Sequence, residues 1–217
     1  MRVQPTTMAG APVVSGSHLE DLVRFFDEGT QLVTVPFPFP RGARSALETA
    51  LAGGGWKQAV AIDGEGVPNE AVLRCLDPRD GLASGQLRAF VGRALEVVAS
   101  LFGVDELGVR LVEATHPPCP RFHVDRVLAR MVITLAGQGS EYLLGEVNRE
   151  KLGHGAHGLP DEESGLMAPG AKIHRVQSDR LCLFKGEAWP GNEGRGLVHR
   201  SPPPNGLRRW LMTVDLL

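Results

Sequence analysis

Cysteine is scarce in this sequence, with three among 217 residues, at positions 75, 119 and 182. Their odd number and wide spacing argue against a disulfide framework. The formal net charge of −2 argues against a nucleic-acid-binding surface. No apolar run approaches the roughly 18 residues of a membrane span, and residues 1–16 lack the apolar segment of a secretory signal. We therefore expect a cytoplasmic protein that contacts neither nucleic acid nor membrane.

Glycine and proline are plentiful by contrast, at 27 and 16 residues. Such a composition indicates many turns, as an antiparallel β fold requires. We expect a flexible N-terminus over residues 1–16, followed by a single domain over 17–217. Within that domain, residues 17–106 are expected to be mainly helical and residues 107–217 to form a β-barrel.

Helical patterns occupy the first half of the chain. Ser17 and Glu20 have the spacing of a capping box, which predicts a helix start. A second short helix is expected at 45–51. The longest is expected at 85–102, where apolar residues recur on one helical face, and Gly103 is placed to end it.

Strand-like segments fill the second half of the chain. These candidate strands are short, and Gly, Pro, Asn or Asp separates several of them; they are 108–114, 122–127, 130–136, 141–144, 172–176, 180–185, 196–200 and 208–216. Eight strands without helices between them favour a sandwich, jelly roll or barrel over a parallel sheet.

The long gap at 148–170 is rich in glycine, histidine and acidic residues. Few large apolar residues are available to anchor it, so we expect it to be the least ordered part after the N-terminus. It is also a candidate lid over the mouth of the barrel. His154 and His157 have ligand-like spacing, but a solvated loop explains them as well.

The chemistry concentrates first around His123 and Asp125. Side chains at i and i+2 of a strand share one face, so these two are expected to project together. An imidazole and a carboxylate side by side supply two ligands of a three-ligand metal face. A hydrogen-bonded surface pair is the alternative interpretation of the same motif.

A second histidine, His199, follows about 75 residues later on a candidate strand near the C-terminus. Two histidines and one carboxylate make the facial triad that holds iron(II) and leaves positions open for oxygen and a co-substrate. We therefore predict that His123, Asp125 and His199 bind one metal ion.

The order His-x-Asp, a distant His and then an Arg ten positions later resembles the iron(II)/2-oxoglutarate dioxygenase superfamily. That arginine is Arg209. More closely, the strings CPRFHVDRV, GQGSEYL, LFKGEAW and HRSPPP resemble an uncharacterised bacterial family, DUF1826. The closer resemblance covers most of the chain from about residue 111 to 217.

The resemblance implies an α+β fold. Its C-terminal double-stranded β-helix, a jelly-roll or cupin-like barrel, would pack against the N-terminal helices. It also implies a metal-dependent oxygenase that uses iron(II) and the small-molecule co-substrate 2-oxoglutarate on an unknown substrate. Arg209 would receive the far carboxylate of 2-oxoglutarate. If Arg209 faces inward, Leu211 and Thr213 do too, while Arg208 and Trp210 point outward.

Two other functions fit the same residues. One is a zinc-binding protein with a role in metal homeostasis, in which Cys119 completes a tetrahedral site. A packed thiol in a turn is the simpler interpretation of Cys119. The other is a non-catalytic barrel used as a binding module.

Three further residues are candidates for supporting roles. Lys185 is a reserve partner for a carboxylate, although an exposed lysine at a strand end is the common case. Arg130 points either into the barrel or into a salt bridge at its rim. Cys182 lies between two leucines and is expected in the core.

Overall fold

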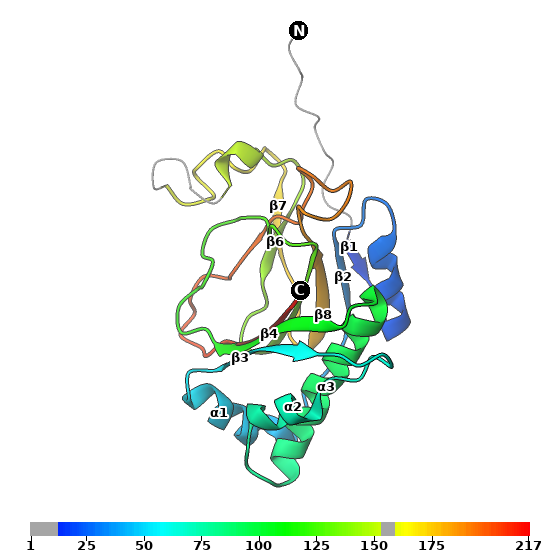
Figure 1. The fold of residues 1–217 in the computed structure, drawn as a ribbon. Coiled ribbons are helices and arrows are strands. Elements are labelled where there is room, and N and C mark those ends of the chain that lie inside the picture. Colours follow the sequence, from blue (N-terminus) through cyan, green and yellow to red (C-terminus); the bar gives the residue numbers. More distant parts are fainter. Residues whose placement is uncertain (1–12, 153–158) are drawn as a thin grey trace.

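A large twisted sheet organises the chain, and the computed structural model describes it within residues 13–152 and 159–217 (Figure 1). Seven strands form it in the order β1-β2-β8-β5-β10-β4-β3. All neighbours are antiparallel except β1 and β2. In that spatial order, the strands are Val13–Ser15, Leu32–Pro36, Arg180–Lys185, Ala129–Ala136, Trp210–Leu216, Glu106–Glu113 and Trp56–Ala61.

A smaller sheet has the order β7-β6-β9, with strands Lys172–Arg175, Glu141–Leu144 and His199–Arg200. Tyr142 of β6 and the residues that flank β7 and β9 pack against the large sheet in a shared cluster, whose buried members are Leu32, Val132, Val176, Cys182, Phe184, Leu197 and Leu211. The two sheets therefore enclose a second core between them. Cys182 belongs to it and is 1% exposed, as its sequence context predicted.

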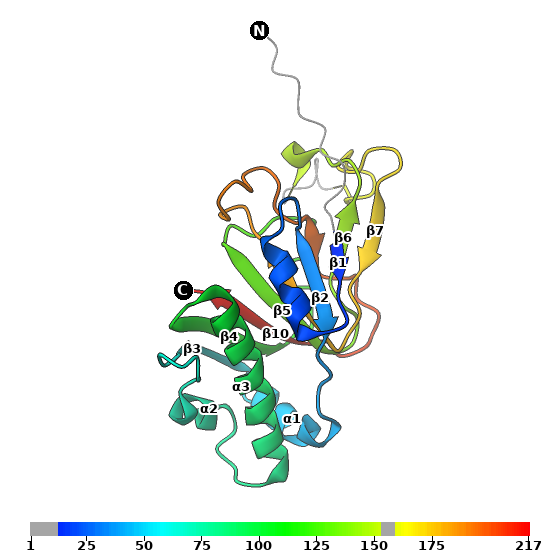
Figure 2. The ribbon, with the colours of Figure 1, turned by 90° about the vertical axis from the view of Figure 1, so that its right-hand side faces the viewer.

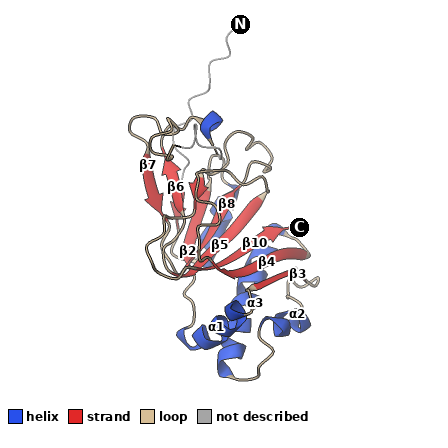
Figure 3. Cartoon of the chain, turned by 90° about the vertical axis from the view of Figure 1, so that its left-hand side faces the viewer, coloured by secondary structure: helices blue, strands red, loops and turns tan. Residues whose placement is uncertain are grey.

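Helices cover the other side of the large sheet, and α1 to α3 lie at the opposite end of the molecule from β6 and β7 (Figure 3). The α-helices of the described part are α1 Arg44–Ala52, α2 Glu70–Leu76 and α3 Leu82–Phe102. Short 3-10 helices are η1 Leu19–Phe26, η2 Arg41–Ala43 and η3 Arg149–Lys151. Figure 2 shows η1 lying along β2. Alternate strand residues therefore face either the helices or the inter-sheet core.

The expected end of the longest helix is confirmed. Gly103 follows α3 in the left-handed conformation, with φ of 64°, which glycine adopts without steric cost. The expected capping box is shifted by one residue. His18 is the N-cap of η1, and Asp21, not Glu20, accepts the backbone N–H groups of Ser17 and His18.

Three strands lie where none was expected: β1 within the N-terminal segment expected to be flexible, and β2 and β3 within the part expected to be mainly helical. β2 pairs with β8, and β3 pairs with β4, so the N-terminal segment completes the large sheet. The burial pattern of β3 has only two buried residues of six, so it shows no clear alternation in the sequence. The mixed α+β architecture with a large sheet is thus built from both halves of the chain.

The prediction of a strand at 122–127 is wrong. His123 forms a single bridge with His199, and the flanking backbone groups take other partners. The N–H of Phe122 donates to the carboxylate of Asp161 at 2.9 Å, and the carbonyl of Asp125 accepts from Glu187 at 2.8 Å. Each group is satisfied without a continuous ladder, so the segment stays irregular.

The membrane-spanning potential of the helices follows from their length and composition. Among the described residues, none of them combines the length and the apolar character that crossing a bilayer requires.

Candidate metal centre

Three ligand atoms converge where β9 meets the irregular segment after β4. His123, Asp125 and His199 each offer one such atom, and these atoms lie within 4.8 Å of one another. Two backbone hydrogen bonds of 3.0 Å join His123 and His199 in both directions, and their ring centroids are 4.5 Å apart. The structure thus brings together the three residues selected from the sequence.

Both imidazoles are oriented by backbone carbonyls. Nδ1 of His123 lies 2.9 Å from the carbonyl oxygen of Arg121, and Nδ1 of His199 lies 3.0 Å from that of Leu197. A carbonyl oxygen only accepts, so each Nδ1 carries the proton and donates it. In the neutral ring each Nε2 then presents a lone pair, as a metal ligand requires.

These lone pairs point toward Asp125. Nε2 of His199 lies 3.4 Å from Oδ2 of Asp125, and Nε2 of His123 lies 3.9 Å from Oδ1. Burial lowers the pKa of His199, which keeps this ring neutral near pH 7. Oδ2 of Asp125 is buried and has no hydrogen-bond partner among the described residues. Three electron-pair donors facing one another around an orphaned oxygen fit a bound cation.

The other oxygen of Asp125 is fixed by Arg130. The guanidinium donates to Oδ1 at 2.7 Å and to both oxygens of Asp215 on β10, at 2.6 and 3.0 Å. Arg130 therefore joins the carboxylate of the site to the large sheet. A salt bridge was one of the two roles expected for Arg130. The structure shows such a bridge, and it lies at the candidate metal centre.

The end of β8 holds the backbone of the same segment. Gly186 donates to the carbonyl of Leu128 at 3.0 Å, and Glu187 donates to that of Asp125 at 2.8 Å. A Cβ on Gly186 would overlap the carbonyl oxygen of Val127. Only glycine lets the two segments approach this closely.

Gly186→Ala is therefore expected to lower the free energy of unfolding by at least about 2 kcal/mol, a large single-residue effect. Urea unfolding monitored by circular dichroism measures it. Gly85→Ala is the matched control, because a Cβ there meets nothing within 4 Å on α3. That change should raise stability by about 0.5 to 1 kcal/mol. A Gly186→Ala protein as stable as wild type would contradict the close approach.

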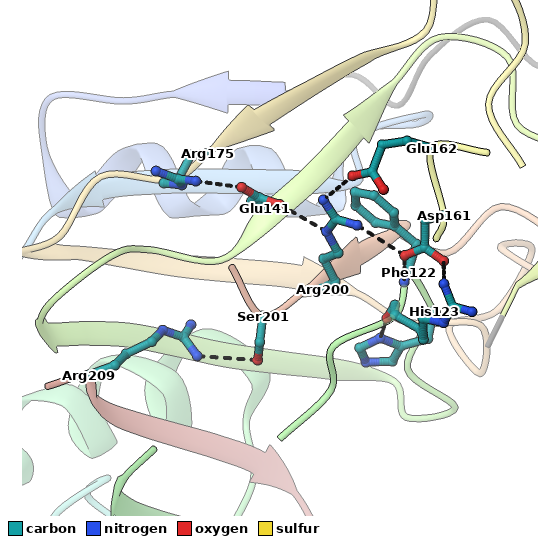
Figure 4. A network of polar contacts seen from close by, with 10 residues as sticks. Phe122, His123, Glu141, Asp161, Glu162, Arg175, Arg200, Ser201 and Arg209 are labelled. Atoms are coloured by element: carbon teal, nitrogen blue, oxygen red, sulfur yellow. Dashed lines mark hydrogen bonds and ion pairs between the residues drawn. The ribbon is translucent and has the colours of Figure 1, made fainter. Parts of the chain in front are cut away.

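Arg209 is buried, 7% exposed, just before β10. Its guanidinium donates to the carbonyl of Gln138 at 2.8 Å and to the hydroxyl of Ser140 at 3.0 Å. It also donates to the hydroxyl of Ser201 at 3.3 Å (Figure 4). Three of its five N–H groups are thereby used, and no carboxylate of the described residues pairs with it. Burial lowers its pKa to about 10, so it remains a cation at pH 7.

The orientation expected for this stretch is confirmed. Trp210 and Met212 belong to the core beside the helices, and Leu211 belongs to the core between the sheets. Arg208 is exposed and pairs with Glu113 at 3.4 Å. The role of Arg209 toward a co-substrate stays a prediction.

A cleft of about 460 Å³ opens beside Arg209. Its lining includes Glu113, Gln138, Ser201 and Arg208, but none of the three converging ligands. Arg209 therefore lies between this cleft and the core that the two sheets enclose.

Lys185, the reserve candidate for a carboxylate partner, lies on the other face of the sheet from the candidate metal centre. It is 4% exposed, and its ammonium lies over the rings of Phe25 and Trp189, at 4.8 and 5.5 Å. Strand alternation puts it on the opposite face of β8 from Phe184, whose ring contacts His199. Lys185 thus belongs to the helix side of the sheet, and burial lowers its pKa.

Cys119 is exposed, and its thiol is not part of the three-residue cluster. Its carbonyl oxygen accepts the N–H of Ser201 at 2.8 Å. Cys119 thus contacts the second ligand segment through its backbone.

The segment 148–170 is anchored where it is described, contrary to its composition. Asp161, Ser164 and Leu166 are 2%, 5% and 0% exposed. Residues 153–158, which include His154 and His157, lie outside the described residues, as do 1–12 of the expected flexible N-terminus. Leu166 packs in an apolar cluster, whereas Asp161 is held by ion pairs that the composition of the loop does not reveal.

Arg200 is the centre of these ion pairs (Figure 4). It is 7% exposed and donates to Glu141 at 2.9 Å, to Asp161 at 3.1 Å and to Glu162 at 2.6 Å. Arg175 pairs with the same Glu141. The sequence offers one signal for this network, an arginine directly after the late histidine.

Comparison with known proteins places the chain in a family and gives its fold solved relatives. The family model described as "Protein of unknown function (DUF1826)" matches residues 16–215. No curated protein matches in sequence. The rice dioxygenase for auxin oxidation aligns over 95% of this chain and 82% of that one, at 14% identity and a TM-score of 0.50.

Two further solved structures align less closely. HygX from Streptomyces hygroscopicus, with nickel and 2-oxoglutarate bound, aligns over 92% of this chain and 86% of that one, at 15% identity and a TM-score of 0.46. An oxidoreductase of the 2OG-Fe(II) oxygenase family from Burkholderia pseudomallei aligns over 94% of both chains, at 13% identity and a TM-score of 0.43. At such identities the likeness concerns the fold alone.

Proposed function

The chain belongs to the DUF1826 family, and we propose that it is an iron(II)- and 2-oxoglutarate-dependent oxygenase of the cytoplasm. The two packed sheets would be the double-stranded β-helix of such enzymes, within one domain over residues 17–217. The observation that carries the proposal is the pairing of two features that the run from His199 to Ser201 connects. A three-donor face has an orphaned carboxylate oxygen, and a buried arginine has no carboxylate partner among the described residues.

His123, Asp125 and His199 would hold the iron. Two neutral imidazoles and one carboxylate favour iron(II) and leave the remaining positions to oxygen and co-substrate. When bound, iron(II) supplies the redox chemistry that couples oxidation of 2-oxoglutarate to oxidation of an organic substrate. The protein contributes orientation: Arg130 fixes Asp125, and the backbone carbonyls of Arg121 and Leu197 fix the two rings.

Arg209 would bind the far carboxylate of 2-oxoglutarate. Its fork retains two N–H groups after its three hydrogen bonds to the protein. Those bonds lock the guanidinium plane, so little side-chain entropy remains to be lost on binding. Because the side chain is buried, a dicarboxylate would meet the cation in a low-dielectric setting where a charge-assisted bond is strong.

Metal content and co-substrate binding test this function directly. Protein purified without chelators and loaded anaerobically with iron(II) is expected to bind one equivalent of metal, and then 2-oxoglutarate. Elemental analysis and isothermal titration calorimetry measure the two. Metal-free protein should bind 2-oxoglutarate far more weakly, because the keto-acid end loses its anchor.

Two results would contradict the oxygenase. Zinc retained without any binding of 2-oxoglutarate would favour a zinc protein with the same three ligands. Neither metal nor co-substrate binding would leave a barrel that serves as a binding module.

A further inference from the structure

One peptide group connects the anchored loop to a candidate metal ligand. The peptide between Arg121 and Phe122 has its N–H on Phe122 and its carbonyl on Arg121. Oδ2 of Asp161 accepts that N–H at 2.9 Å, and Nδ1–H of His123 donates to that carbonyl at 2.9 Å. Figure 4 shows Asp161 and the His123 ring on either side of this backbone. A carboxylate, an amide and an imidazole thus form one chain of hydrogen bonds.

We propose that Asp161 is a positioning residue for His123, acting through the Arg121–Phe122 peptide; this rests on the metal centre proposed above. An anion at the N–H end polarises the amide, so its carbonyl oxygen becomes a better acceptor. The stronger bond to Nδ1–H holds the ring in one orientation and raises the basicity of Nε2, as partners of metal-bound histidines do. Asp161 extends that support by one peptide.

Asp161 is well fixed for this role. It is 2% exposed, and its charge is compensated by Arg200 at 3.1 Å and by Arg121 at 3.3 Å. Arg200 is itself held by Glu141 and Glu162. The hydroxyl of Ser164 donates to the backbone carbonyl of Asp161 at 2.8 Å, which closes the turn after it. The carboxylate is therefore placed by several bonds of its own, and a small movement of it would be transmitted to the peptide.

The stacking of Arg200 adds a second constraint on the same segment. Its guanidinium lies 4.2 Å from the centre of the Phe122 ring, and Phe122 is fully buried. Arg200 also follows His199 directly in sequence. The ion pairs around Arg200 therefore help to orient both imidazoles. They act on His123 through Asp161, and on His199 through the backbone of β9.

The chain offers a matched pair of variants that separates positioning from mere ion pairing. Asp161→Asn keeps the shape and an acceptor oxygen but removes the charge that polarises the peptide. Glu162→Gln, at the next position, also removes one carboxylate charge that pairs with Arg200. In the structure, however, Glu162 has no hydrogen bond to the Arg121–Phe122 peptide. Thermal unfolding of both confirms that each variant is folded before binding is compared.

Two readouts are used on the full chain. In metal-free protein, the Nδ1–H proton of His123, followed by 15N–1H nuclear magnetic resonance, should shift upfield and exchange faster in Asp161→Asn. In a cobalt(II) titration, followed by its visible absorption, Asp161→Asn should bind about tenfold more weakly, the lower end of the range for outer-shell partners. Glu162→Gln should match wild type in both. If Asp161→Asn does not fold, Asp161→Glu, which displaces the carboxylate by one methylene, should give the same two changes.

Each outcome decides one of the two proposals. An unchanged His123 proton and unchanged cobalt affinity in Asp161→Asn would overturn the positioning role. The same losses in Glu162→Gln would overturn it too, because they would trace the effect to the charge on Arg200. If wild type binds no cobalt but Asp161→Asn still shifts the His123 proton, the metal centre fails and the hydrogen-bond chain through the peptide stands.

Discussion

His123→Ala is expected to remove most of the bound metal. The variant loses one of three donors and leaves Asp125 and His199 as an incomplete face. Loss of an outer-shell partner alone weakens metal binding by about 10- to 100-fold, so loss of a ligand should exceed about 100-fold. Elemental analysis after dialysis, together with a cobalt(II) titration, measures the change.

Cys119→Ser is the control for this result. Its thiol is exposed and outside the cluster, so metal content should stay at the wild-type level. The opposite pattern, with metal lost in Cys119→Ser and retained in His123→Ala, would support a thiolate-ligated zinc site. Circular dichroism of both proteins separates loss of metal from loss of fold.

Arg209→Ala should weaken 2-oxoglutarate binding by about 10- to 100-fold, because hydrogen bonds to charged groups contribute about 1.5 to 3 kcal/mol. Metal content should remain near normal, since Arg209 lies outside the ligand cluster. Calorimetric titration of the metal-loaded protein measures the affinity. Arg209→Lys should also bind poorly, because an ammonium keeps the charge but lacks the planar fork.

Arg208→Ala is the matched control at the adjacent position. The Arg208 side chain is 73% exposed and, among the described residues, forms an ion pair with Glu113 alone, so its loss should leave co-substrate binding unchanged. If Arg209→Ala binds 2-oxoglutarate as wild type does, while Arg208→Ala does not, the roles of the two arginines are reversed. If wild type itself binds none, the oxygenase proposal fails.

The sequence was sufficient to select the three converging residues, although part of the reasoning was wrong. His123 and Asp125 were paired by strand alternation, but their segment forms only a single bridge. What brings them together is a set of individual bonds, from Glu187 to the carbonyl of Asp125 and from Arg130 to its carboxylate. Residue types and order carried the information, whereas local periodicity did not.

Alternation did succeed for β10, where the strand is long and both faces are buried. Placing Arg209 inward and Trp210 outward follows from a period of two, and the two cores contain the residues that this period assigns to them. β2 and β3 escaped detection because neither shows a clear alternation of buried and exposed residues. Their pairing with β4 and β8 is a long-range contact that local pattern does not encode.

The anchoring of residues 159–170 was missed because composition does not reveal which charged residues pair in the folded chain. Asp161 is buried as fully as many core residues, since Arg200 offsets its charge and the backbone of Phe122 uses its lone pairs. Arg200 lies 39 positions away in sequence. Anchoring by buried ion pairs over such separations becomes visible only when the chain is folded.

The run His199, Arg200 and Ser201 has a consequence for how this chain tolerates change. These three consecutive residues contact the metal face, the anchored loop and Arg209 in turn. Inserting or deleting one residue here would move all three contacts to the wrong neighbour, and no single compensating substitution would restore them. The exposed residues 203–206 that follow border the open cleft and make none of these three contacts. Length variation among relatives should therefore appear within 203–206, but not within the run from His199 to Ser201.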